Sequence, residues 1–468
     1  MHDLIIIGAG PGGYVAAIRA AQLGMKVALI EREELGGTCL NHGCIPTKAL
    51  YKNAQVLSYF KKSETFGIHL DGGFSLDMDL VQQRKQSVVK TLVSGVGQLL
   101  KTNGVTVIKG EARILAPGRV EVTAADGSNS TVEAARILIA TGSDSAMPPV
   151  PGMDLEGVIT SREALALSSV PKRIVIVGGG VIGIEFAGIF KEFGAEVTVV
   201  EFMPAILPLM DRDIAKRLAR TLTKQRGIRI LVDTRVERVE KASDGSLVAS
   251  IAAKDSTEQI ACDCVLVATG RVSNVKGLGL DELGVKYDRR GVKVDENYET
   301  NVKGIYAIGD VTGRVMLAHV ASEEGVVAVE RMMGHDRALN YDLIPAAVFT
   351  FPDVATVGLT EEQLVERNIE YRVGKSMYAG NGKALTMNDA EGIVKVLASP
   401  DSSALYGVHI LGPNASDTIT EAVAAMNGMF TLEEISRVVH GHPTLSEAFA
   451  EAVNSLIGCA IHTPNARK

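Results

Sequence analysis

Two cysteines, Cys39 and Cys44, have the clearest chemical potential in this chain, because a thiol pair can cycle between dithiol and disulfide. In a regular α-helix, residues five apart are separated by about 8–9 Å at Cα, which exceeds the roughly 7 Å that a disulfide tolerates. A bridge therefore needs an irregular turn, for which Gly43 supplies backbone freedom. Pro46 can open a helix just afterwards, which would place Cys44 at a helix N-terminus, where the dipole lowers a thiol pKa. For this spacing alone, two unpaired thiols in a buried turn are the alternative.

A glycine-rich loop occurs twice in the chain, and the two copies are offset by 170 residues. Each copy follows an apolar strand, opens a helix, and precedes a second strand that ends in an acid, Glu31 or Glu201. This context brings backbone close to a pyrophosphate at a helix N-terminus and aims a carboxylate at a ribose hydroxyl. The repeat therefore predicts two dinucleotide-binding sites. The glycines are Gly8, Gly10 and Gly13 in the first copy and Gly178, Gly180 and Gly183 in the second.

Further strand patterns predict an α/β chain with two Rossmann-like dinucleotide-binding domains and a C-terminal α+β domain. Two buried-strand runs end in Ala-Thr-Gly, at Gly142 and Gly270, where each nucleotide region would close. A third strand ends near Asp310, which could contact a cofactor or simply cap the next turn. We predict the first domain over 1–147, the second over 148–270, a return to the first over 271–344, and the C-terminal domain over 345–468.

The composition argues against several classes of function. A net charge of −7 and the lack of a Lys/Arg run argue against a nucleic-acid binder. The most membrane-like stretch, 174–190, carries interior glycines and Glu185, so it predicts a strand, a turn and a helix. No signal peptide is expected, and five cysteines are too few for a secreted disulfide scaffold. We therefore expect a reducing, cytoplasmic setting, or an organelle matrix after removal of a presequence.

The remaining cysteines show no pattern that indicates chemistry. Cys262 and Cys264 flank Asp263 at a predicted strand start, where we expect core thiols that face opposite sides rather than a metal site. Cys459 lies alone near the C-terminus. We expect no metal ligands in this chain.

Together these patterns resemble the pyridine nucleotide–disulfide oxidoreductases along essentially the whole chain, and most of all their dihydrolipoamide-oxidising branch. The cysteine turn and the HxHPTxxE pattern are specific to the family, whereas MLAH and GxHIxGP favour that branch. The segments are GGTCLNHGCIPTKAL over 36–50, GDV over 309–311, MLAH over 316–319, GVHILGP over 407–413 and HGHPTLSE over 440–447. The resemblance implies an FAD-binding domain in two parts, an NAD-binding domain between them, and a homodimer built on the C-terminal domain.

The resemblance also implies roles for the candidate catalytic residues. Cys39 would meet the substrate, Cys44 would lie against the flavin, and the two would form a redox disulfide. His442 would be the acid/base, because a thiol needs a base to yield thiolate at neutral pH, and Glu447 would orient its imidazole. This pair would reach the cysteines of the partner subunit. Thr444-x-x-Glu447 also fits a helix capping box, so Glu447 could instead cap a helix.

The same resemblance assigns a larger set of residues to the cofactors. Lys48 would lie near the flavin and pair with Glu185 on the helix of the second loop, although solvated surface charges are the alternative. The FAD-binding candidates are Gly8, Gly10, Gly13, Glu31, Gly37, Thr38, Lys48, Ala112, Thr141, Gly142, Asp310, Met316, Leu317, Ala318 and His319. The NAD-binding candidates are Gly178, Gly180, Gly183, Glu185, Glu201 and Gly270.

The chain departs from the family pattern at three places. Ser273 stands where the family usually has proline, and the loop 379–383 has glycine and lysine where the dihydrolipoamide branch commonly shows Ser-Arg. Neither position touches the expected redox relay. Ala112 stands where a glycine often contacts FAD, and its backbone could still serve.

We therefore expect an enzyme that oxidises protein-bound dihydrolipoamide with NAD+. A glutathione-reductase-like enzyme is the nearest alternative, but NADPH calls for arginines after the second loop, where Glu201 would repel a 2′-phosphate. A mercuric reductase would need a C-terminal cysteine pair, and Cys459 stands alone. A flavin-binding assembly subunit without turnover is the alternative of a different class, and the retained Cys39, Cys44 and His442 argue against it. The expected partners are lipoyl-bearing proteins of 2-oxoacid dehydrogenase or glycine-cleavage complexes, with neither nucleic acid nor membrane.

Overall fold

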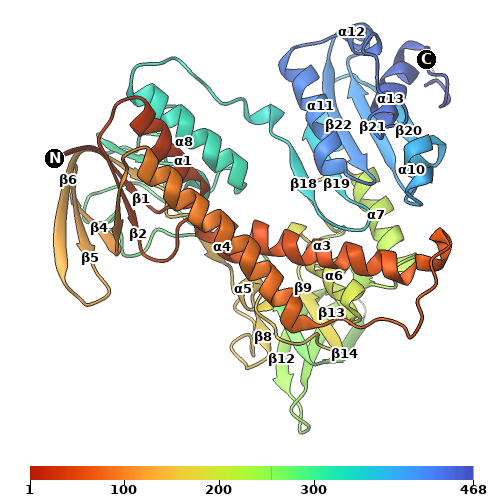
Figure 1. The fold of residues 1–468 in the computed structure, drawn as a ribbon, viewed down its shortest axis with the longest axis horizontal. Coiled ribbons are helices and arrows are strands. Elements are labelled where there is room, and N and C mark those ends of the chain that lie inside the picture. Colours follow the sequence, from red (N-terminus) through yellow and green to blue (C-terminus); the bar gives the residue numbers. More distant parts are fainter. Residues whose placement is uncertain (255, 467–468) are drawn as a thin grey trace.

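Two sheets, each carrying one glycine loop, form the N-terminal part of the computed structural model, which describes residues 1–254 and 256–466 (Figure 1). The first sheet has the parallel order β3-β2-β1-β6-β17, and the N-terminal half of β6 continues into the antiparallel strands β5 and β4. Its central strand β1 is buried from residue 4 to residue 7, as a strand covered on both faces requires. The strands are β1 (His2–Ile7), β2 (Val27–Glu31), β3 (Thr106–Lys109), β4 (Glu111–Ala116), β5 (Arg119–Thr123), β6 (Asn129–Ile139) and β17 (Ile305–Ala307).

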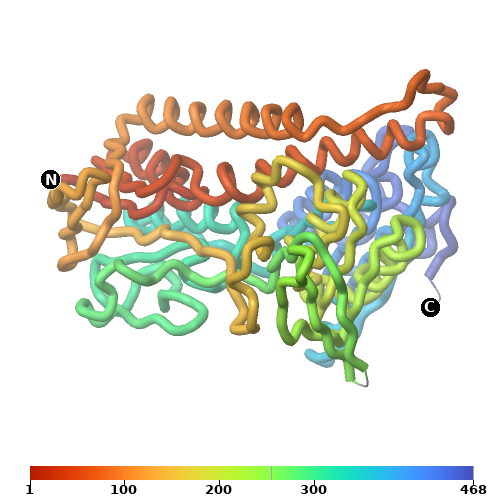
Figure 2. The backbone as a smooth tube through the Cα atoms, turned by 90° about the horizontal axis from the view of Figure 1, so that it is seen from below, coloured from red at the N-terminus to blue at the C-terminus, as the bar shows by residue number. Residues whose placement is uncertain are grey.

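Five of the described helices pack beside the first sheet or extend from it toward the rest of the molecule. Helix α1 (Pro11–Gln22) packs against α8 (Ala318–Met332), while α2 (Gly37–His42) leads into the longer α3 (Cys44–Lys61). The longest helix, α4 (Met78–Thr102), packs on α3 and runs along one long side of the molecule (Figure 2). Short 3-10 turns follow α3 and β17, as η1 (Ser63–Phe66) and η2 (Gly309–Thr312).

The second sheet repeats the topology of the first. Strand β9 pairs in parallel with β10 and β15, as β1 pairs with β2 and β6, and an antiparallel unit again stands beside the parallel strands. The parallel order is β11-β10-β9-β15-β8, so the prediction of two dinucleotide-binding folds is confirmed. The strands are β8 (Val158–Ile159), β9 (Arg173–Val177), β10 (Glu196–Val200), β11 (Arg229–Leu231), β12 (Arg235–Lys241), β13 (Leu247–Ala253), β14 (Ser256–Cys262) and β15 (Cys264–Val267). The helices are α5 (Ser161–Ala164), α6 (Val181–Phe193) and α7 (Arg212–Lys224).

Two local predictions within the second sheet are confirmed. The apolar stretch 174–190 forms β9, a turn and most of α6. Cys262 ends β14 and Cys264 begins β15, and the two thiols are buried in different hydrophobic clusters, as expected for side chains that face opposite ways. Within the residues that the structure describes, no helix is both long and apolar enough to cross a bilayer.

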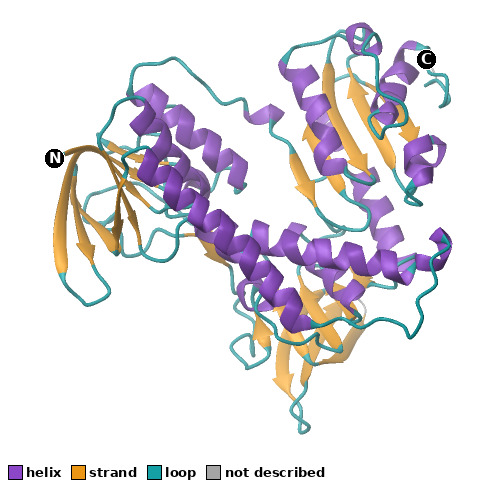
Figure 3. Cartoon of the chain, in the orientation of Figure 1, coloured by secondary structure: helices purple, strands orange, loops and turns teal. Residues whose placement is uncertain are grey.

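A five-stranded antiparallel sheet of order β18-β19-β22-β21-β20 forms the C-terminal domain, with helices packed around it (Figure 3). Helix α11 packs on β19 and β22, and α13 packs on β20 and β21. The strands are β18 (Ala346–Val348), β19 (Val354–Gly358), β20 (Arg372–Met377), β21 (Ile393–Ala398) and β22 (Leu405–Leu411). The helical segments are η3 (Tyr341–Leu343), α9 (Glu361–Glu366), η4 (Tyr378–Gly380), α10 (Gly382–Thr386), α11 (Ala415–Asn427), α12 (Leu432–Ser436) and α13 (Glu447–Ile457).

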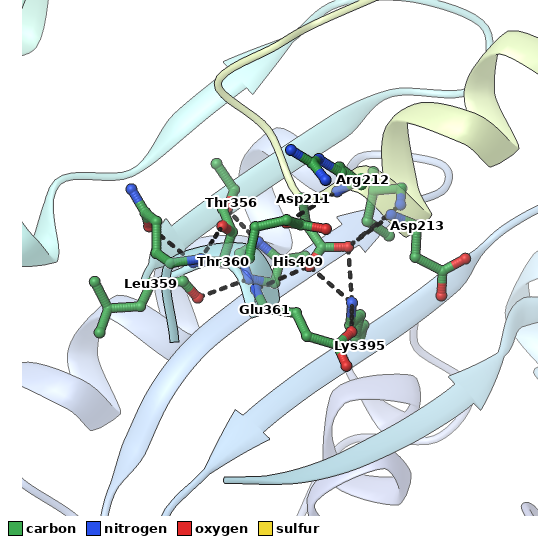
Figure 4. A network of polar contacts seen from close by, with 12 residues as sticks. Asp211, Arg212, Asp213, Thr356, Leu359, Thr360, Glu361, Lys395 and His409 are labelled. Atoms are coloured by element: carbon green, nitrogen blue, oxygen red, sulfur yellow. Dashed lines mark hydrogen bonds and ion pairs between the residues drawn. The ribbon is translucent and has the colours of Figure 1, made fainter. Parts of the chain in front are cut away.

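A buried ionic cluster joins the C-terminal domain to the second module, by which we mean the second parallel sheet with its helices and antiparallel strands (Figure 4). The first module is the corresponding unit around the first sheet. Lys395 on β21 donates to both carboxylate oxygens of Asp211, at 2.8 and 2.7 Å, and to Glu361 at 2.5 Å. The side chains of Lys395 and Asp211 are fully buried, and Asp211 also caps the N-terminus of α7. The imidazole of His409 lies in the same cluster and donates from Nε2 to the Leu359 carbonyl at 3.0 Å. A fully buried ion pair, Lys395 with Asp211, therefore crosses the domain boundary, and the partly exposed Glu361 adds a second carboxylate to the same ammonium.

We predict that Lys395→Ala lowers the free energy of unfolding by about 3–5 kcal/mol, because it leaves buried carboxylates without a counter-charge. Lys375→Ala is the matched control, since Lys375 pairs with Asp213 across the same boundary at 2.7 Å but both side chains are partly exposed. That control should cost less than about 1 kcal/mol. Urea unfolding of both variants measures these free energies. An equal loss in the two variants would contradict a stabilising role of the buried Lys395–Asp211 pair.

Candidate active site

The two cysteines lie on either side of a break between two helices. Helix α2 carries Cys39 and ends at His42, and α3 begins at Cys44 itself, with Gly43 between them. A Cβ at Gly43 would lie 2.9 Å from the carbonyl oxygen of Thr38, so glycine is required by crowding. Pro46 lies in the first turn of α3 rather than at its first residue. The expected irregular turn is therefore present, and it places Cys44 at a helix N-terminus.

The two thiols interact directly and have different acidities. Both are half-buried free thiols in the structure. The interaction between the two thiols lowers the pKa of Cys44 below its ordinary value and raises that of Cys39. Burial opposes the shift at Cys44, and the nearby ammonium of Lys48 adds to it. In the reduced pair, Cys44 is therefore the thiolate and Cys39 the thiol.

The expected ion pair between Lys48 and Glu185 is present. Lys48 Nζ, on the first turns of α3, lies 2.9 and 2.8 Å from the two oxygens of Glu185 on α6. The backbone N–H of Phe349 donates to the same carboxylate at 3.1 Å, and Lys48 lies 4.5 Å from the centre of the Phe349 ring. Since the Glu185 side chain is only 4% exposed, the charge of Lys48 is held on the side of α3 that faces the second module.

His442 and Glu447 form a hydrogen-bonded pair on the surface of the C-terminal domain. His442 Nδ1 lies 2.8 Å from Glu447 Oε1, so Nδ1–H donates and Nε2 keeps a free lone pair. The other oxygen, Oε2, accepts the backbone N–H of Thr444 at 2.7 Å. The capping box is only half formed, because the Thr444 hydroxyl donates to the Gly441 carbonyl instead. One oxygen of Glu447 therefore bonds His442 and the other bonds the Thr444 N–H, while α13 begins at Glu447 itself with Ser446, not Thr444, as its N-cap residue.

The cysteine pair and the His442–Glu447 pair lie apart within one chain. The start of α3 lies near the middle of the molecule, whereas α13, which begins at Glu447, lies on the outer part of the C-terminal domain (Figure 1). The His442 side chain is 79% exposed. A base that bonds its own orienting carboxylate and otherwise faces solvent is ready to meet a thiol supplied by another molecule.

Both glycine loops have the geometry that a pyrophosphate requires. Gly8 and Gly178 have φ angles of 100° and 110°. A Cβ at either glycine would lie 2.4 Å from the carbonyl oxygen of the residue that follows the neighbouring strand, Ala140 after β6 or Ala268 after β15. A Cβ at Gly10 or Gly180 would meet nothing within 4 Å, so open space faces each loop. A Cβ at Gly13 would lie 1.8 Å from the Gly8 carbonyl, which requires glycine for close helix–strand packing.

The acid after each loop is bound to the loop itself. Glu31 accepts the N–H of Ala9 at 2.6 Å, and Glu201 accepts the N–H of Gly179 at 2.5 Å. The second oxygen of each acid accepts an N–H two residues further along the chain, at 2.6 Å in both copies. These identical contacts hold each carboxylate at the end of its strand beside the glycines, where a ribose would lie next to the pyrophosphate.

The turn that carries Cys39 and Cys44, called the redox turn below, packs directly on the first glycine loop. Gly37 has a φ angle of 55°, and a Cβ there would lie 2.6 Å from the Cα of Gly10. Gly37 is also the first residue of α2, the helix that carries Cys39. A dinucleotide bound at the first loop would therefore lie next to the cysteine pair.

Other predicted cofactor residues surround the same region of the first module. Asp310, in η2, accepts the Ser143 hydroxyl at 2.5 Å, and Arg271 Nε donates to that hydroxyl oxygen at 2.7 Å. Residues 316 and 317 precede α8, and residues 318 and 319 form its first turn. Thr141 Oγ1 donates to the Asn274 carbonyl at 2.8 Å, next to a short antiparallel pair, β7 (Ser143–Ser145) with β16 (Arg271–Ser273). Gly142 and Gly270 have φ angles of 69° and 131° beside this pair.

Ala112 and several unpredicted residues complete the picture. Ala112 is buried in β4 among the hydrophobic residues of the first module. The sequence interpretation missed Ser143 and Arg271, and it also missed Arg162, which lies 2.7 Å from Glu33 and links α5 to the end of β2. These polar pairs join residues more than a hundred positions apart, so the sequence does not reveal them. The only sequence signal near Ser143 and Arg271 is the Ala-Thr-Gly run that directly precedes each of them.

Comparisons with known proteins agree with this geometry. Residues 2–325 match the family model described as pyridine nucleotide-disulphide oxidoreductase, and residues 344–453 match the dimerisation domain of that family. A protein of Pisum sativum named mitochondrial dihydrolipoyl dehydrogenase is 43% identical over 466 residues, which cover 98% of this chain and 92% of the relative. The Homo sapiens protein of the same name is 43% identical over 459 residues, with 96% and 89% covered. The crystal structure of LpdA from Mycobacterium tuberculosis superposes with a TM-score of 0.89 at 28% identity, covering 97% of this chain and 99% of that one.

We predict that Cys44 in the reduced protein forms a thiolate at lower pH than Cys39, and that Lys48→Met raises the pKa of Cys44. The reason is that the Lys48 ammonium stabilises the thiolate, so its removal moves deprotonation to higher pH. Cys39→Ala should raise the same pKa, because the hydrogen-bond donor is lost. The rate of alkylation of Cys44 as a function of pH measures both effects.

Lys52→Met is the matched control, since Lys52 lies one turn further along α3 and its ammonium bonds only Gln55 among the described side chains. It should leave the alkylation profile of Cys44 unchanged. An unchanged profile in Lys48→Met would contradict the proposed electrostatics.

Proposed function

The chain belongs to the pyridine nucleotide–disulfide oxidoreductases, and from this membership we propose that it oxidises protein-bound dihydrolipoamide to lipoamide with reduction of NAD+. It is an oxidoreductase that uses FAD and NAD. The names of the pea and human relatives support dihydrolipoamide as the substrate, and a glutathione-reductase-like activity is not favoured. The single observation that carries the proposal is the cysteine turn, in which Gly37 packs on the loop glycine Gly10.

The thiol chemistry proceeds by exchange at Cys39. In the oxidised pair, one substrate thiolate attacks the Cys39 sulfur, so the Cys39–Cys44 bond breaks and Cys44 leaves as a thiolate. Its low pKa, with Lys48 beside it, makes it the better leaving group. The second substrate thiolate then closes the lipoamide disulfide and releases Cys39, which takes up a proton. The cysteine pair has gained two electrons and the substrate has lost two.

His442 supplies the base for this exchange. Its Nε2 lone pair is free because Nδ1–H is committed to Glu447, so the imidazole can accept a proton from a substrate thiol and return it to Cys39. Glu447 stabilises the imidazolium that forms, and its second oxygen, bound to Thr444, prevents the carboxylate from turning away. The exposure of His442 in a single chain supports its action on the cysteines of the partner subunit.

FAD and NAD, when bound, supply the two-electron hydride chemistry that returns the cysteine pair to the disulfide. We assign FAD to the first loop, because the redox turn abuts that loop, and NAD to the second. Glu201 supports NAD over NADP, since its carboxylate is fixed beside Gly179 and would repel a 2′-phosphate. In the first module, Gly8, Gly10, Glu31 and Asp310 would hold FAD.

The dimerisation domain over residues 344–453 supports a homodimer. We propose lipoyl-bearing proteins of 2-oxoacid dehydrogenase or glycine-cleavage complexes as the partners that deliver the substrate. We further propose a reducing compartment, either the cytoplasm or an organelle matrix. The pea and human relatives are named mitochondrial, so cell fractionation against a mitochondrial marker is the direct test of location.

We predict that the purified protein is yellow and reduces NAD+ with dihydrolipoamide, and that Cys44→Ser abolishes this activity while FAD stays bound. His442→Gln should lower turnover by about 10²- to 10⁴-fold, the usual contribution of a positioned acid/base. The visible spectrum and an NADH absorbance assay, run beside NADPH oxidation with glutathione disulfide, give the result.

Cys459→Ser is the control, since this exposed thiol lies outside the proposed site and should not matter. A colourless protein, dominant glutathione activity, or full activity in Cys44→Ser would refute the proposal.

A further inference from the structure

Helix α8 buries a carboxylate that no established step of the chemistry uses. Glu324 is 1% exposed, and each of its oxygens accepts one strong hydrogen bond. Oε2 accepts the backbone N–H of Gly309 at 2.6 Å, and Oε1 accepts the hydroxyl of Tyr341 at 2.5 Å. Among the described residues, no lysine or arginine lies within ion-pair distance of it, so these two donors are its direct partners, and the charge of Arg314 acts on it from further away.

Burying a carboxylate costs free energy unless its oxygens accept hydrogen bonds. At Glu324 the side chain is buried and each oxygen accepts one hydrogen bond. Burial raises the pKa of Glu324, while the bonds from Tyr341 and Gly309 lower it. The ionised form fits the contacts best, because two donors face two acceptor oxygens. The net effect is a raised pKa, and the two hydrogen bonds join the Glu324 carboxylate to the Gly309 turn on one side and to Tyr341 on the other.

The first of these groups is the turn that follows β17. Gly309 opens η2 with a φ angle of 70°, and the next residue is Asp310. A Cβ at Gly309 would lie 3.0 Å from the Cβ of Ala321, so the turn lies tight against α8. Its conformation sets where the Asp310 carboxylate points.

The second group lies on the segment that leads into the C-terminal domain. Tyr341 opens η3, which precedes β18, the first strand of that domain. Because the Tyr341 hydroxyl donates to Glu324, its oxygen accepts from the Tyr298 hydroxyl, 3.3 Å away. Tyr298 is itself almost fully buried within the first module. The chain of bonds therefore runs from the linker, through Glu324, to the cofactor turn.

The neighbour of Glu324 fixes α8 against the first glycine loop. A Cβ at Gly325 would lie 2.7 Å from the carbonyl oxygen of Gly12, and one at Gly12 would lie 3.1 Å from the carbonyl oxygen of Ala321. Two adjacent residues of α8 thus contact the two segments that would bind the cofactor. Gly325 packs against the first glycine loop, and Glu324 bonds the Gly309–Asp310 turn.

We propose that Glu324 is a positioning residue that holds the Gly309–Asp310 turn in the conformation that binds FAD and couples this turn, through Tyr341, to the linker into the C-terminal domain. The inference rests on the assignment of Asp310 to the FAD site under the proposed function. Glu324 itself need not touch the cofactor. Tyr341 acts on the turn only through Glu324.

The first test uses apo protein and needs no turnover. We expect Glu324→Ala to weaken FAD binding by about ten- to hundredfold, the usual consequence of leaving buried donors without an acceptor. Hydrogen exchange over residues 305–313 should speed up by a similar factor in the apo form. Tyr341→Phe should speed exchange over 305–313 several-fold, although Tyr341 lies outside that segment. Fluorescence titration with FAD and exchange mass spectrometry give these values.

The second test separates a charged positioning role from a merely structural one. Glu324→Gln keeps the shape and one acceptor, so it should bind FAD better than Glu324→Ala and yet raise the midpoint potential of bound FAD, because a buried negative charge has been removed. Glu323→Ala is the matched control on the same helix, since Glu323 is partly exposed and pairs only with Arg337 among the described residues. It should change none of these readouts.

Two results would overturn the inference. One is FAD affinity within twofold of wild type in Glu324→Ala, with unchanged exchange over 305–313. The other is unchanged exchange over that segment in Tyr341→Phe, which decides the coupling even if Glu324→Ala fails to fold. If the wild-type chain binds no FAD, the proposed function fails, whereas the exchange of the apo turn in Tyr341→Phe still decides whether Tyr341 and the turn are coupled.

Discussion

The carboxylate of Glu185 is the point on which the site depends, because all three domains meet there. It receives Lys48 from the redox helix of the first module and the N–H of Phe349 from the C-terminal domain, while it belongs to α6 of the second. Glu185 is 3% exposed, so losing Lys48 would leave a buried charge without its cation. The same contact keeps an ammonium beside Cys44, whose thiolate it stabilises. One interaction therefore contributes both to domain packing and, beside the larger effect of Cys39, to the acidity of Cys44.

The two nucleotide modules show how a repeated fold acquires two different roles. Glu31 and Glu201 clamp their loops through the same pair of backbone bonds, so the sites begin as copies. The first module then adds the cysteine turn, packed at Gly37 against Gly10, and helix α8, packed on α1. This placement supports our proposal that thiol chemistry couples to the dinucleotide of the first loop. The second loop keeps the simpler task of binding a nucleotide beside Glu201.

Much of this arrangement could be predicted from the sequence, and the failures have a common physical cause. Both glycine loops were predictable because motif spacing reports on local geometry, whereas the Lys48–Glu185 pair, which joins distant segments, was predicted only from the family resemblance. Gly43 was expected to supply conformational freedom, and it has φ −143° and ψ −115°, outside both the helical and the extended regions; crowding against Thr38 is a second reason for glycine that the sequence did not reveal. The contacts of Glu324, and of Lys395 with Asp211, left no local signal, because each joins segments that meet only after the sheets have formed.

The central claim is that each site is built from two chains, with cysteines from one and His442 from the other. Mixed dimers of Cys44→Ser and His442→Gln subunits, purified with two different tags, test it most directly. Such a dimer has one intact site in the proposed arrangement, so we predict about half of the wild-type rate of dihydrolipoamide oxidation, while both parent homodimers stay nearly inactive. Activity in the mixed dimer no higher than in either parent would show that the site lies within one chain and would contradict the account.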